Sequence, residues 1–510
     1  MFAARTSATV GRRYASSVSS KAGTISKKTP TWSMKAMTGI ALASGVGVLT
    51  ATTLYYRNPQ SQAPFEFDET KKTIVVLGSG WSAVSAVATM DTNAYNLVWV
   101  SPRNYFLFTP LLPSTTVGTV ELRSIMQPIR FFTRHLARDV LFVEATCTDV
   151  DPDLKIVTVE STASKAGATI QQIKYDYLVV SVGAQNATFG IPGVAENAFF
   201  LKEASDARKI RTQLLDCLES ATFPGQSQEE IDRLLHMVVV GSGPTGVEYA
   251  AELHDFLHDD LSKWYPELAK RFKITLVSHS PHLLTGFSED IIHYSEEVMS
   301  SNKVEFVSNT GVKQVSKTSI LVEHADKTTE EIPAGLIVWA AGNGPRSLTK
   351  SLIAKLPKDS QNSRRGLVID DWMVVKGSRG FIFALGDCTS TRWAQTAQVA
   401  SKQGAFLARQ FRQLQSLEEE RYKYVMVNGG EDGFVQQRLR PFKYEHQGAL
   451  AYVGGDKAVA DLPGVHLFGQ STYYFWRSVY LSEIFSLRNR VLVGFDWVKC
   501  KIFGRDISRE

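Results

Sequence analysis

Residues 73–83 read TIVVLGSGWSA, and residues 236–246 repeat the pattern as HMVVVGSGPTG. In both stretches an uninterrupted β-branched run, typical of a buried parallel strand, leads directly into a glycine-rich turn. The first glycine of such a turn permits the tight bend, the second lets the backbone approach a pyrophosphate, and the following helix offers unpaired N–H groups. A second apolar strand follows each turn. The sequence therefore predicts an α/β fold with two Rossmann-type dinucleotide-binding domains.

Two nucleotide sites in one chain indicate two different dinucleotides. The strand predicted at 380–385 (GFIFAL) ends in Gly386 and Asp387, and an aspartate at a strand end accepts hydrogen bonds from flavin hydroxyls. The same aspartate would also suit a helix cap, so this pair alone leaves both interpretations open. We place FAD at the first turn and NAD(P)H at the second. Segments 175–184 and 336–343 are apolar and end in small residues, and we predict that they carry the chain between the two domains.

Each predicted site draws on its glycine turn, on the end of its second strand and on a small-residue turn. The residues predicted to contact FAD are Gly78, Ser79, Gly80, Trp81, Ser82, Ser101, Gly183 and Asp387. The residues predicted to contact NAD(P)H are Gly241, Gly243, Pro244, Thr245, Gly246, Ser278 and Gly342.

Serines replace the usual acidic residue at the end of the second strand in both units. That acidic residue normally bonds the adenosine ribose, but Ser101 and Ser278 occupy the two positions here. A missing carboxylate also removes repulsion against a 2′-phosphate. We therefore predict that NADPH is accepted alongside NADH.

Composition argues against several other classes of protein. The chain has 510 residues, 44% of them hydrophobic and 21% charged, which suits a globular protein of two or three domains. A net charge of +5 without basic stretches interleaved with aromatics argues against a nucleic-acid partner. The four cysteines are scattered singly, so we expect no metal site and no redox cysteine pair at the flavin. Segment 410–440 is charged and irregular, and it carries no calcium-loop pattern.

The amino terminus has the composition of a targeting segment. From residue 1 to residue 64 there is no Asp or Glu, while Arg and Lys stand among many Ser, Thr and Ala. This pattern predicts a mitochondrial transit peptide at 1–30, with a disordered basic tail as the other interpretation. Residues 37–56 are uncharged and long enough for one transmembrane helix, but their modest hydrophobicity also suits an extended presequence.

The carboxy-terminal segment 473–504 mixes Trp, Tyr and Phe with apolar residues and Arg or Lys. A helix built from it would be amphipathic and cationic, which favours a position on an anionic membrane surface. A helix used for dimerisation or core packing would have the same aromatic content.

Several long stretches resemble the mitochondrial type II (alternative, rotenone-insensitive) NADH:ubiquinone oxidoreductases of fungi and plants. They include VVLGSGWSAVS, SPRNYFLFTPLLPS, VVVGSGPTGVEYAAEL, TAQVA, PFKYEHQGALAYVG and WRSVYLSEIFSLRNR. The resemblance implies a single-subunit, non-proton-pumping respiratory-chain enzyme that passes electrons from NADH through FAD to ubiquinone. The other readings are a ferredoxin-type reductase and an apoptosis-inducing-factor-like flavoprotein that acts as an interaction module.

The resemblance also implies roles for individual residues. Glu248 matches the carboxylate close to the flavin and nicotinamide, and Gln398 and Tyr480 match quinone-pocket positions. The family's second glutamine is Lys402 here, and we expect the neighbouring Gln403 to compensate for it. The further FAD contacts implied by the matching stretches are Arg103, Thr109, Pro110, Ala397 and Gln398.

These inferences give a predicted organisation for the whole chain. FAD-binding segments are expected at 70–200 and 346–440, with the NAD(P)H-binding domain at 201–345 between them. A membrane-anchoring region is expected at 441–510, which also offers a surface for homodimerisation. The expected location is the mitochondrial inner membrane, in contact with its lipid. If 37–56 spans this membrane with the presequence on the matrix side, the catalytic body faces the intermembrane space, which is the side we expect; if that segment is cleaved, the body lies in the matrix.

Overall fold

The computed structural model describes residues 63–162, 169–429 and 433–509. The predicted transit peptide at 1–30 and the possible transmembrane helix at 37–56 lie outside these residues. Among the helices of the described part, none combines the length and the apolar character needed to cross a bilayer.

A seven-stranded sheet contains the first predicted nucleotide-binding unit, with strand order β20-β8-β1-β2-β5-β6-β7. The strands are β1 (Thr73–Leu77), β2 (Asn96–Ser101), β5 (Leu141–Asp151), β6 (Ile156–Ser161), β7 (Ile170–Lys174), β8 (Tyr177–Val180) and β20 (Ile382–Ala384). Strand β1 pairs in parallel with β2 and β8, and every residue of β1 is buried. Strand β20 adds to the edge beside β8 although it lies some two hundred residues later in the chain, so this domain is built from two separate segments.

A second, five-stranded parallel sheet contains the second predicted unit, with order β10-β17-β11-β12-β13. The strands are β10 (Phe199–Phe200), β11 (His236–Val240), β12 (Lys273–Val277), β13 (Val304–Val307) and β17 (Leu336–Trp339). The helices of this part are α6 (Ala204–Ala221), α7 (Gln228–Leu234), α8 (Pro244–Phe256), α9 (Ser262–Trp264), α10 (Pro266–Ala269) and α11 (Glu289–Ser301), with the π-helical turn η3 (Leu257–Leu261) after α8. A three-stranded antiparallel sheet follows, made of β14 (Gly311–Val315), β15 (Ser319–Glu323) and β16 (Thr329–Pro333). The paired Rossmann units expected from the glycine turns are confirmed.

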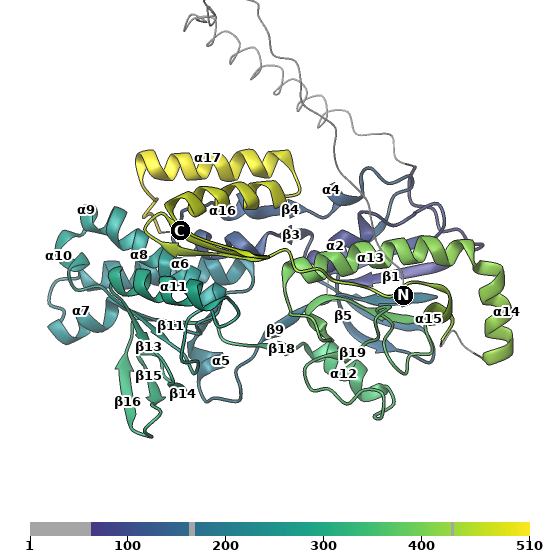
Figure 1. The fold of residues 1–510 in the computed structure, drawn as a ribbon, viewed down its shortest axis with the longest axis horizontal. Helices are drawn as coiled ribbons and strands as arrows, with labels where there is room; N and C mark the ends of the chain where they lie inside the picture. The colour runs from purple at the N-terminus through teal and green to yellow at the C-terminus, as the bar shows by residue number, and fades with distance from the viewer. Residues whose placement is uncertain (1–62, 163–168, 430–432, 510) are drawn as a thin grey trace, which may run out of the picture. The chain divides into compact units, whose positions relative to one another are not determined.

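Two short antiparallel strands, β9 (Ala184–Asn186) and β18 (Asn343–Pro345), join the two sheets. They directly follow β8 and β17, the two strands predicted to carry the chain across. Figure 1 shows β9 and β18 between the two sheets, where the chain leaves the first domain and returns to it. The predicted double crossing is therefore confirmed.

Segment 410–440 is helical, so the prediction of an irregular segment is wrong. It contains the end of α13 (Ala397–Ser416), α14 (Glu418–Asn428) and α15 (Phe434–Arg438). The side chains of Leu407, Phe411 and Leu414 are buried, because their spacing places them on one face of α13. Most of the described charged side chains of the segment are exposed, but Arg421 of α14 is buried.

Shorter elements complete the first domain and the link to the second. The strands are β3 (Tyr105–Leu107), β4 (Met126–Pro128), β19 (Leu367–Val368) and β21 (Thr389–Ser390). The helices are α2 (Trp81–Val87), η1 (Thr109–Leu111), α3 (Leu112–Thr115), η2 (Leu122–Ile125), α4 (Arg130–Thr133), α5 (Val194–Asn197), α12 (Ser347–Lys355) and η4 (Gly386–Cys388).

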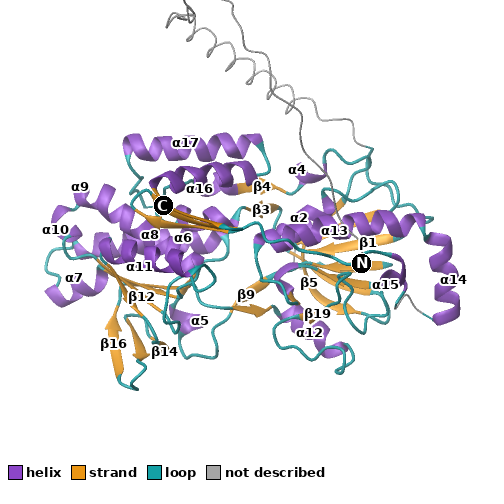
Figure 2. Cartoon of the chain, viewed as in Figure 1, coloured by secondary structure: helices purple, strands orange, loops and turns teal. Residues whose placement is uncertain are grey.

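The carboxy-terminal region is a three-stranded antiparallel sheet followed by two helices, as Figure 2 shows. The strands are β22 (Ala449–Gly454), β23 (Lys457–Leu462) and β24 (Val465–Gly469), and the helices are α16 (Gln470–Glu483) and α17 (Leu487–Phe503). The single helix expected from 473–504 is thus divided in two. The division has a local cause, because Ser486 Oγ accepts a hydrogen bond of 3.1 Å from Asn489 N and so caps the start of α17.

Candidate active site

A cavity of about 770 Å³ receives residues from both nucleotide-binding units. From the predicted FAD set it is lined by Gly78, Ser79, Gly80, Trp81, Ser82, Ser101, Arg103, Thr109, Gly183, Asp387 and Ala397. From the predicted NAD(P)H set it is lined by Thr245 and Gly342. Residues 78–82 and 183, 245 and 342 come from distant parts of the sequence, so the fold brings the two predicted sites together at one cavity.

The other predicted residues do not line this cavity. They are Pro110, Glu248, Gln398, Lys402 and Tyr480, together with Gly241, Gly243, Pro244, Gly246 and Ser278 of the second unit. The second glycine turn therefore meets the cavity mainly through Thr245.

The glycine turns have the backbone that a pyrophosphate site requires. Gly78 has φ +105°, and a Cβ there would lie 2.2 Å from the carbonyl oxygen of Ser181, so only glycine fits. A Cβ on Gly80 would meet no protein atom within 4 Å and would point into open space instead. Neither α2 nor α8 has a side-chain hydrogen bond at its N-cap, which leaves backbone N–H groups for an anion. These residues fit a dinucleotide pyrophosphate at each turn.

A serine pair closes each turn in place of the usual carboxylate. Ser101 Oγ donates to Ser79 Oγ at 2.9 Å in the first unit. In the second unit, the hydroxyls of Ser242 and Ser278 lie 2.8 Å apart, and Ser278 Oγ also accepts from Ser280 N at 3.1 Å. No carboxylate therefore stands at the position that normally bonds the adenosine ribose in either unit.

Asp387 lies within η4 and lines the cavity. It does not cap α13, the helix that follows. That cap is Thr396, whose Oγ1 accepts from Val399 N at 3.3 Å at the start of α13. Burial raises the pKa of Asp387, and the nearby positive charge of Lys202 partly offsets the rise. The helix-cap interpretation of Asp387 is therefore wrong, and Asp387 is a half-buried carboxyl group that lines the cavity.

Sequence reasoning missed a group of charged cavity residues at the start of α6 and on β18. Lys202 Nζ donates to Asn343 Oδ1 at 2.6 Å, and burial lowers the pKa of Lys202. Glu203 accepts hydrogen bonds from Arg103 and, at 3.2 Å, from Arg346. The one local signal was that Glu203 and Asp206 form the capping box of α6.

Glu248 is buried one turn along α8 from Thr245, on the side of the carboxy-terminal region. Its Oε1 accepts from the backbone N–H of Tyr452 at 3.2 Å. Burial raises the pKa of Glu248 to about 8, because the charged form loses its hydration. The charge of Glu248 also contributes to the raised pKa of Tyr480, so these two predicted residues lie close together.

The predicted quinone residues of α13 face the carboxy-terminal region. Gln398 Oε1 accepts from the hydroxyl of Tyr444 at 3.2 Å, and Gln398 Nε2 donates to the carbonyl of Gly448 at 3.4 Å. Lys402, one turn further on, is half-buried. Gln403 does not compensate for the lysine, because its buried amide oxygen accepts from Gly386 N at 2.7 Å. Gln403 therefore fixes the turn that carries Asp387, and this expectation from the sequence is wrong.

An aromatic cluster connects the cavity with the carboxy-terminal helices. Trp81 lines the cavity, and its Nε1 donates to Thr109 Oγ1 at 3.1 Å. Its ring centroid lies 5.0 Å from that of Phe106, 5.4 Å from Phe108 and 5.9 Å from Phe485. Phe485 lies between α16 and α17 and is 38% exposed. A continuous apolar surface thus extends from the flavin-side turn to the outer face of this region.

These features define a class of protein, namely oxidoreductases that bring a flavin and a nicotinamide dinucleotide together. In agreement, residues 72–404 match the family model described as pyridine nucleotide-disulphide oxidoreductase. Residues 446–506 match a second model, described as NDH2 C-terminal domain.

Individual relatives narrow the class. The chain is 45% identical to the external alternative NADH-ubiquinone oxidoreductase, mitochondrial, of Yarrowia lipolytica, over 95% of this chain and 88% of the relative. It is 42% identical to external NADH-ubiquinone oxidoreductase 2, mitochondrial, of Saccharomyces cerevisiae, over 88% and 85% of the two chains. The chain belongs to the family of mitochondrial alternative NADH-ubiquinone oxidoreductases, the type II enzymes.

Solved structures agree with this placement. The structure of NDH2 from Plasmodium falciparum in complex with NADH superposes with a TM-score of 0.77 at 27% identity, covering 86% of this chain and all of that one. The sulfide:quinone oxidoreductase of Aquifex aeolicus shares the fold, with a TM-score of 0.59 at 18% identity over 85% and 96% of the two chains.

Proposed function

We propose that the protein catalyses the oxidation of NADH by ubiquinone as a single-subunit, non-proton-pumping enzyme of the mitochondrial respiratory chain. Membership of the type II family supports this reaction. The observation that carries it is the single cavity shared by the first glycine turn and by Thr245 and Gly342 of the second unit. A shared cavity holds the two reacting rings against each other, so hydride transfer becomes an effectively unimolecular step.

When bound in the cavity, FAD would supply the redox chemistry of the reaction. The backbone at residues 78–82 would hold its pyrophosphate, and Asp387 would accept hydrogen bonds from its hydroxyls. Thr109 and Pro110 stand at the wall beside the ring, while Arg103, Gly183, Ala397 and Gln398 complete the surroundings. The segments 70–200 and 346–440 form this domain, and 201–345 forms the NAD(P)H domain.

NAD(P)H binds at the second glycine turn. The backbone of this turn is shaped by Gly241, Gly243, Pro244 and Gly246, and Ser278 lies at the end that binds the adenosine ribose. Because the Ser242–Ser278 pair carries no negative charge, a 2′-phosphate meets no repulsion there. NADPH is therefore a substrate alongside NADH. A specificity constant for NADPH at or below about one-thousandth of that for NADH, roughly 4 kcal/mol, would contradict this.

The quinone end of the site lies between α13 and the carboxy-terminal region. Gln398 binds a quinone carbonyl through its amide N–H, Tyr480 stands beside it, and Glu248 supplies a proton as the quinone is reduced. Lys402 contributes a positive charge at the position where the resemblance to the type II family implies a second glutamine. Lys402→Gln is expected to leave flavin reduction by NADH unchanged and to alter only the kinetics with quinone. Slower flavin reduction by NADH in this variant would contradict the assignment.

The carboxy-terminal helices rest on an anionic lipid surface. Val491, Phe495, Val498 and Ile502 are 55–66% exposed and share one face of α17, because they recur at helical spacing. Arg488, Arg490 and Lys499 flank this face, as expected for an interfacial helix. The apolar face fits the lipid of the mitochondrial inner membrane, and a homodimer through the same face is the competing occupant.

The catalytic body faces the intermembrane space, as the word external in the names of the yeast relatives suggests. Protease digestion of mitochondria with intact and with ruptured outer membranes tests this. Digestion only after outer-membrane rupture is expected, and protection in both preparations would place the body in the matrix.

The reaction itself is tested with purified, flavin-loaded protein, NADH and a short-chain ubiquinone. Sustained turnover with fast flavin reoxidation by quinone is expected. A long-lived charge-transfer complex that quinone does not discharge would favour an interaction module of the apoptosis-inducing-factor type. Flotation with cardiolipin-containing vesicles, against size measurement in detergent, separates lipid binding from dimerisation.

A further inference from the structure

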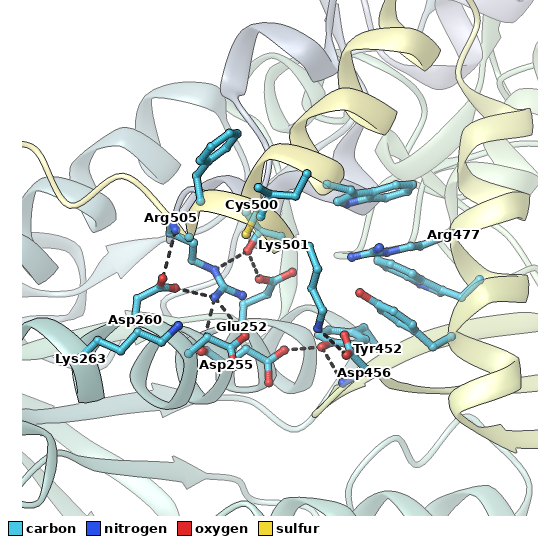
Figure 3. Close-up of a pocket in the computed structure, with 18 of the residues that line it drawn as sticks. Glu252, Asp255, Asp260, Lys263, Tyr452, Asp456, Arg477, Cys500, Lys501 and Arg505 are labelled. Atoms are coloured by element: carbon cyan, nitrogen blue, oxygen red, sulfur yellow. Dashed lines mark hydrogen bonds and ion pairs between the residues drawn. The ribbon is translucent and has the colours of Figure 1, made fainter. Parts of the chain in front are cut away.

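A second cavity, of about 560 Å³, lies between α8, η3 and the end of the chain. Its lining includes Thr119, Glu252, Asp255, Tyr452 and Arg505. Figure 3 shows Arg505 pointing toward Asp260 from the end of α17, with Glu252 and Asp255 beside it on α8. None of the residues proposed to bind FAD, NAD(P)H or quinone lines this cavity. Its role is not explained by the nucleotide sites.

Glu252 is the link between this cavity and the quinone end of the active site. It lines the cavity although its side chain is buried, and it follows Glu248 by four residues on α8. At that spacing two side chains share one helix face, with their Cβ atoms about 5–6 Å apart. The charge of Glu252 contributes to the raised pKa of Glu248, so the two carboxyl groups interact. Glu248 lines neither cavity, whereas Glu252 lines the second one.

Hydroxyl groups continue the hydrogen-bonded path outward from Glu252. Thr119 Oγ1 donates to Glu252 Oε2 at 2.5 Å, and Ser114 Oγ donates to Glu252 Oε1 at 2.6 Å. Arg505 Nε in turn donates to Thr119 Oγ1 at 2.9 Å, inside the cavity. The carboxylate is thus held in one position, with both oxygens engaged.

The reaction needs such a path. Oxidation of NADH by a quinone consumes one proton: NADH, H⁺ and quinone give NAD⁺ and quinol. The C–H bond of NADH breaks to deliver a hydride, and two O–H bonds form on the quinol. One of these protons must come from solution, and Glu248 is buried away from it.

We propose that Glu252 passes protons from the second cavity to Glu248 during quinone reduction. Glu252 is in this sense a positioning residue, since it acts through Glu248 and touches neither substrate nor flavin. The inference rests on the proposed role of Glu248 at the quinone end of the site.

Titratable groups surround Glu252 on several elements. They are Glu248 and Asp255 on α8, Tyr452 on β22, Tyr473 on α16, Cys500 on α17 and Arg505 beyond it, whereas α3 and the loop after it contribute the hydroxyls of Ser114 and Thr119. Burial raises the pKa of Glu248 to about 8 and that of Asp255 to about 7. A carboxyl group with such a pKa both takes up and releases a proton near neutral pH.

The test measures proton exchange at Glu248 in flavin-loaded enzyme at rest, without substrate. The infrared band of the protonated Glu248 carboxyl is identified by its disappearance in Glu248→Gln, and its shift is followed after mixing with D2O. In the wild-type enzyme the band is expected to shift within the mixing time, and in Glu252→Gln at least tenfold more slowly. Asp259→Asn, which removes a half-exposed carboxylate at the outer rim of the same cavity, is the matched control and leaves the exchange rate unchanged.

A kinetic readout accompanies the exchange measurement. Glu252→Gln slows quinol formation about tenfold and raises its solvent isotope effect, with flavin reduction by NADH unchanged, and Glu252→Asp restores part of the rate. Equal exchange rates in the wild-type and Glu252→Gln enzymes would overturn the relay. If the variant does not fold, the wild-type enzyme alone decides, and slow exchange of its Glu248 proton would overturn the relay. If Glu248→Gln reduces quinone normally, the role of Glu248 in the proposed function fails instead.

Discussion

Gly78 and Gly80 stand in one turn, but the protein around them sets different requirements for each residue. Gly78 has a positive φ and lies against the backbone of Ser181, so the fold itself excludes a side chain there. Gly80 has room for a Cβ within the protein, so only a bound pyrophosphate would exclude one. The two positions therefore separate a folding requirement from a binding requirement.

The pair gives the first prediction. Gly78→Ala is expected to lower the thermal midpoint and the bound flavin together, because a Cβ 2.2 Å from a carbonyl oxygen forces the strand β8 to move. Gly80→Ala is expected to keep the thermal midpoint of the apoprotein and to weaken FAD binding at least tenfold, about 1.4 kcal/mol. The measurements are the flavin-to-protein absorbance ratio and thermal unfolding with and without added FAD. A Gly80→Ala protein with full flavin content would contradict the placement of the pyrophosphate.

Glu248 gives a prediction on pH. Its pKa rises from the ordinary 4.5 to about 8 on folding, so the native state holds a proton that the unfolded chain releases. Its contribution to stability is complete below about 4.5 and is lost as the pH rises to about 8, with a slope of at most about 1.4 kcal/mol per pH unit. The thermal midpoint is expected to fall less between pH values of about 6 and 8.5 in Glu248→Gln than in the wild type. Glu267→Gln, an exposed carboxylate, is the control and should follow the wild type.

Residue types explain which parts of the site were predictable from the sequence. The first glycine turn and Asp387, which line the cavity, could be predicted because their neighbours in sequence define their surroundings. Lys202, Glu203 and Arg346 were missed, since they follow two strands far apart in the sequence, β10 and β18, and only the folded chain brings them to one cavity. The role of Gln403 was misjudged for the same reason, because its partner Gly386 lies on another element.

At the scale of elements, the helices α2 and α13 pack closely enough to require a small residue at their contact. A Cβ on Gly404 of α13 would lie 2.2 Å from the carbonyl oxygen of Ser82 on α2. The contact presses the helix of the first glycine turn against the helix that carries Gln398 and Lys402. The distance between the flavin and the quinone residues thus depends on this packing.

Gly404→Ala is accordingly expected to destabilise the protein by about 1–3 kcal/mol, as in other overpacked contacts. Gly494 of α17 is the matched control, because a Cβ there meets no atom within 4 Å. Gly494→Ala is expected to stabilise its helix by about 0.5–1 kcal/mol. Thermal unfolding of both variants checks the pair, and equal midpoints would show that α2 and α13 are free to separate.

The spacing of apolar residues along each strand and helix also explains which elements could be predicted from the sequence. Strands β1 and β11 were identifiable because an apolar β-branched run leads into glycine in each. The helices of segment 410–440 were not recognised, because α14 buries only Arg421 and so shows no apolar stripe in its sequence. The break between α16 and α17 depends on the cap at Ser486, which a count of aromatic residues does not reveal.

At the scale of the whole molecule, the end of the chain ties both nucleotide domains to the carboxy-terminal helices. Arg505 Nη1 donates to Asp260 Oδ2 at 2.8 Å on the NAD(P)H side, and Arg505 Nε donates to Thr119 on the FAD side. Both Arg505 and Asp260 are buried. Nearby carboxylates outweigh the cost of burial and raise the pKa of Arg505, so it remains charged.

Arg505→Ala is expected to destabilise the protein by about 3–5 kcal/mol, because it leaves Asp260 charged and buried without its partner. Arg509→Ala, which removes an exposed ion pair with Asp216, is the control and should cost about 0–1 kcal/mol. Thermal unfolding and limited proteolysis of the carboxy-terminal region measure the difference. Equal effects of the two changes would mean that the tail contributes nothing to holding the domains together.

The pairing of β9 with β18 has a consequence for how this protein can be rebuilt. Asn186 and Asn343 lie opposite each other in that pairing, so everything between them leaves and re-enters the first domain at one point. Residues 187–342 are therefore a cassette with adjoining ends. A chimaera that exchanges this cassette with that of a strictly NADH-dependent relative should transfer the coenzyme preference together with Glu248 and Glu252, while Asp387, Gln398 and Tyr480 stay with the host.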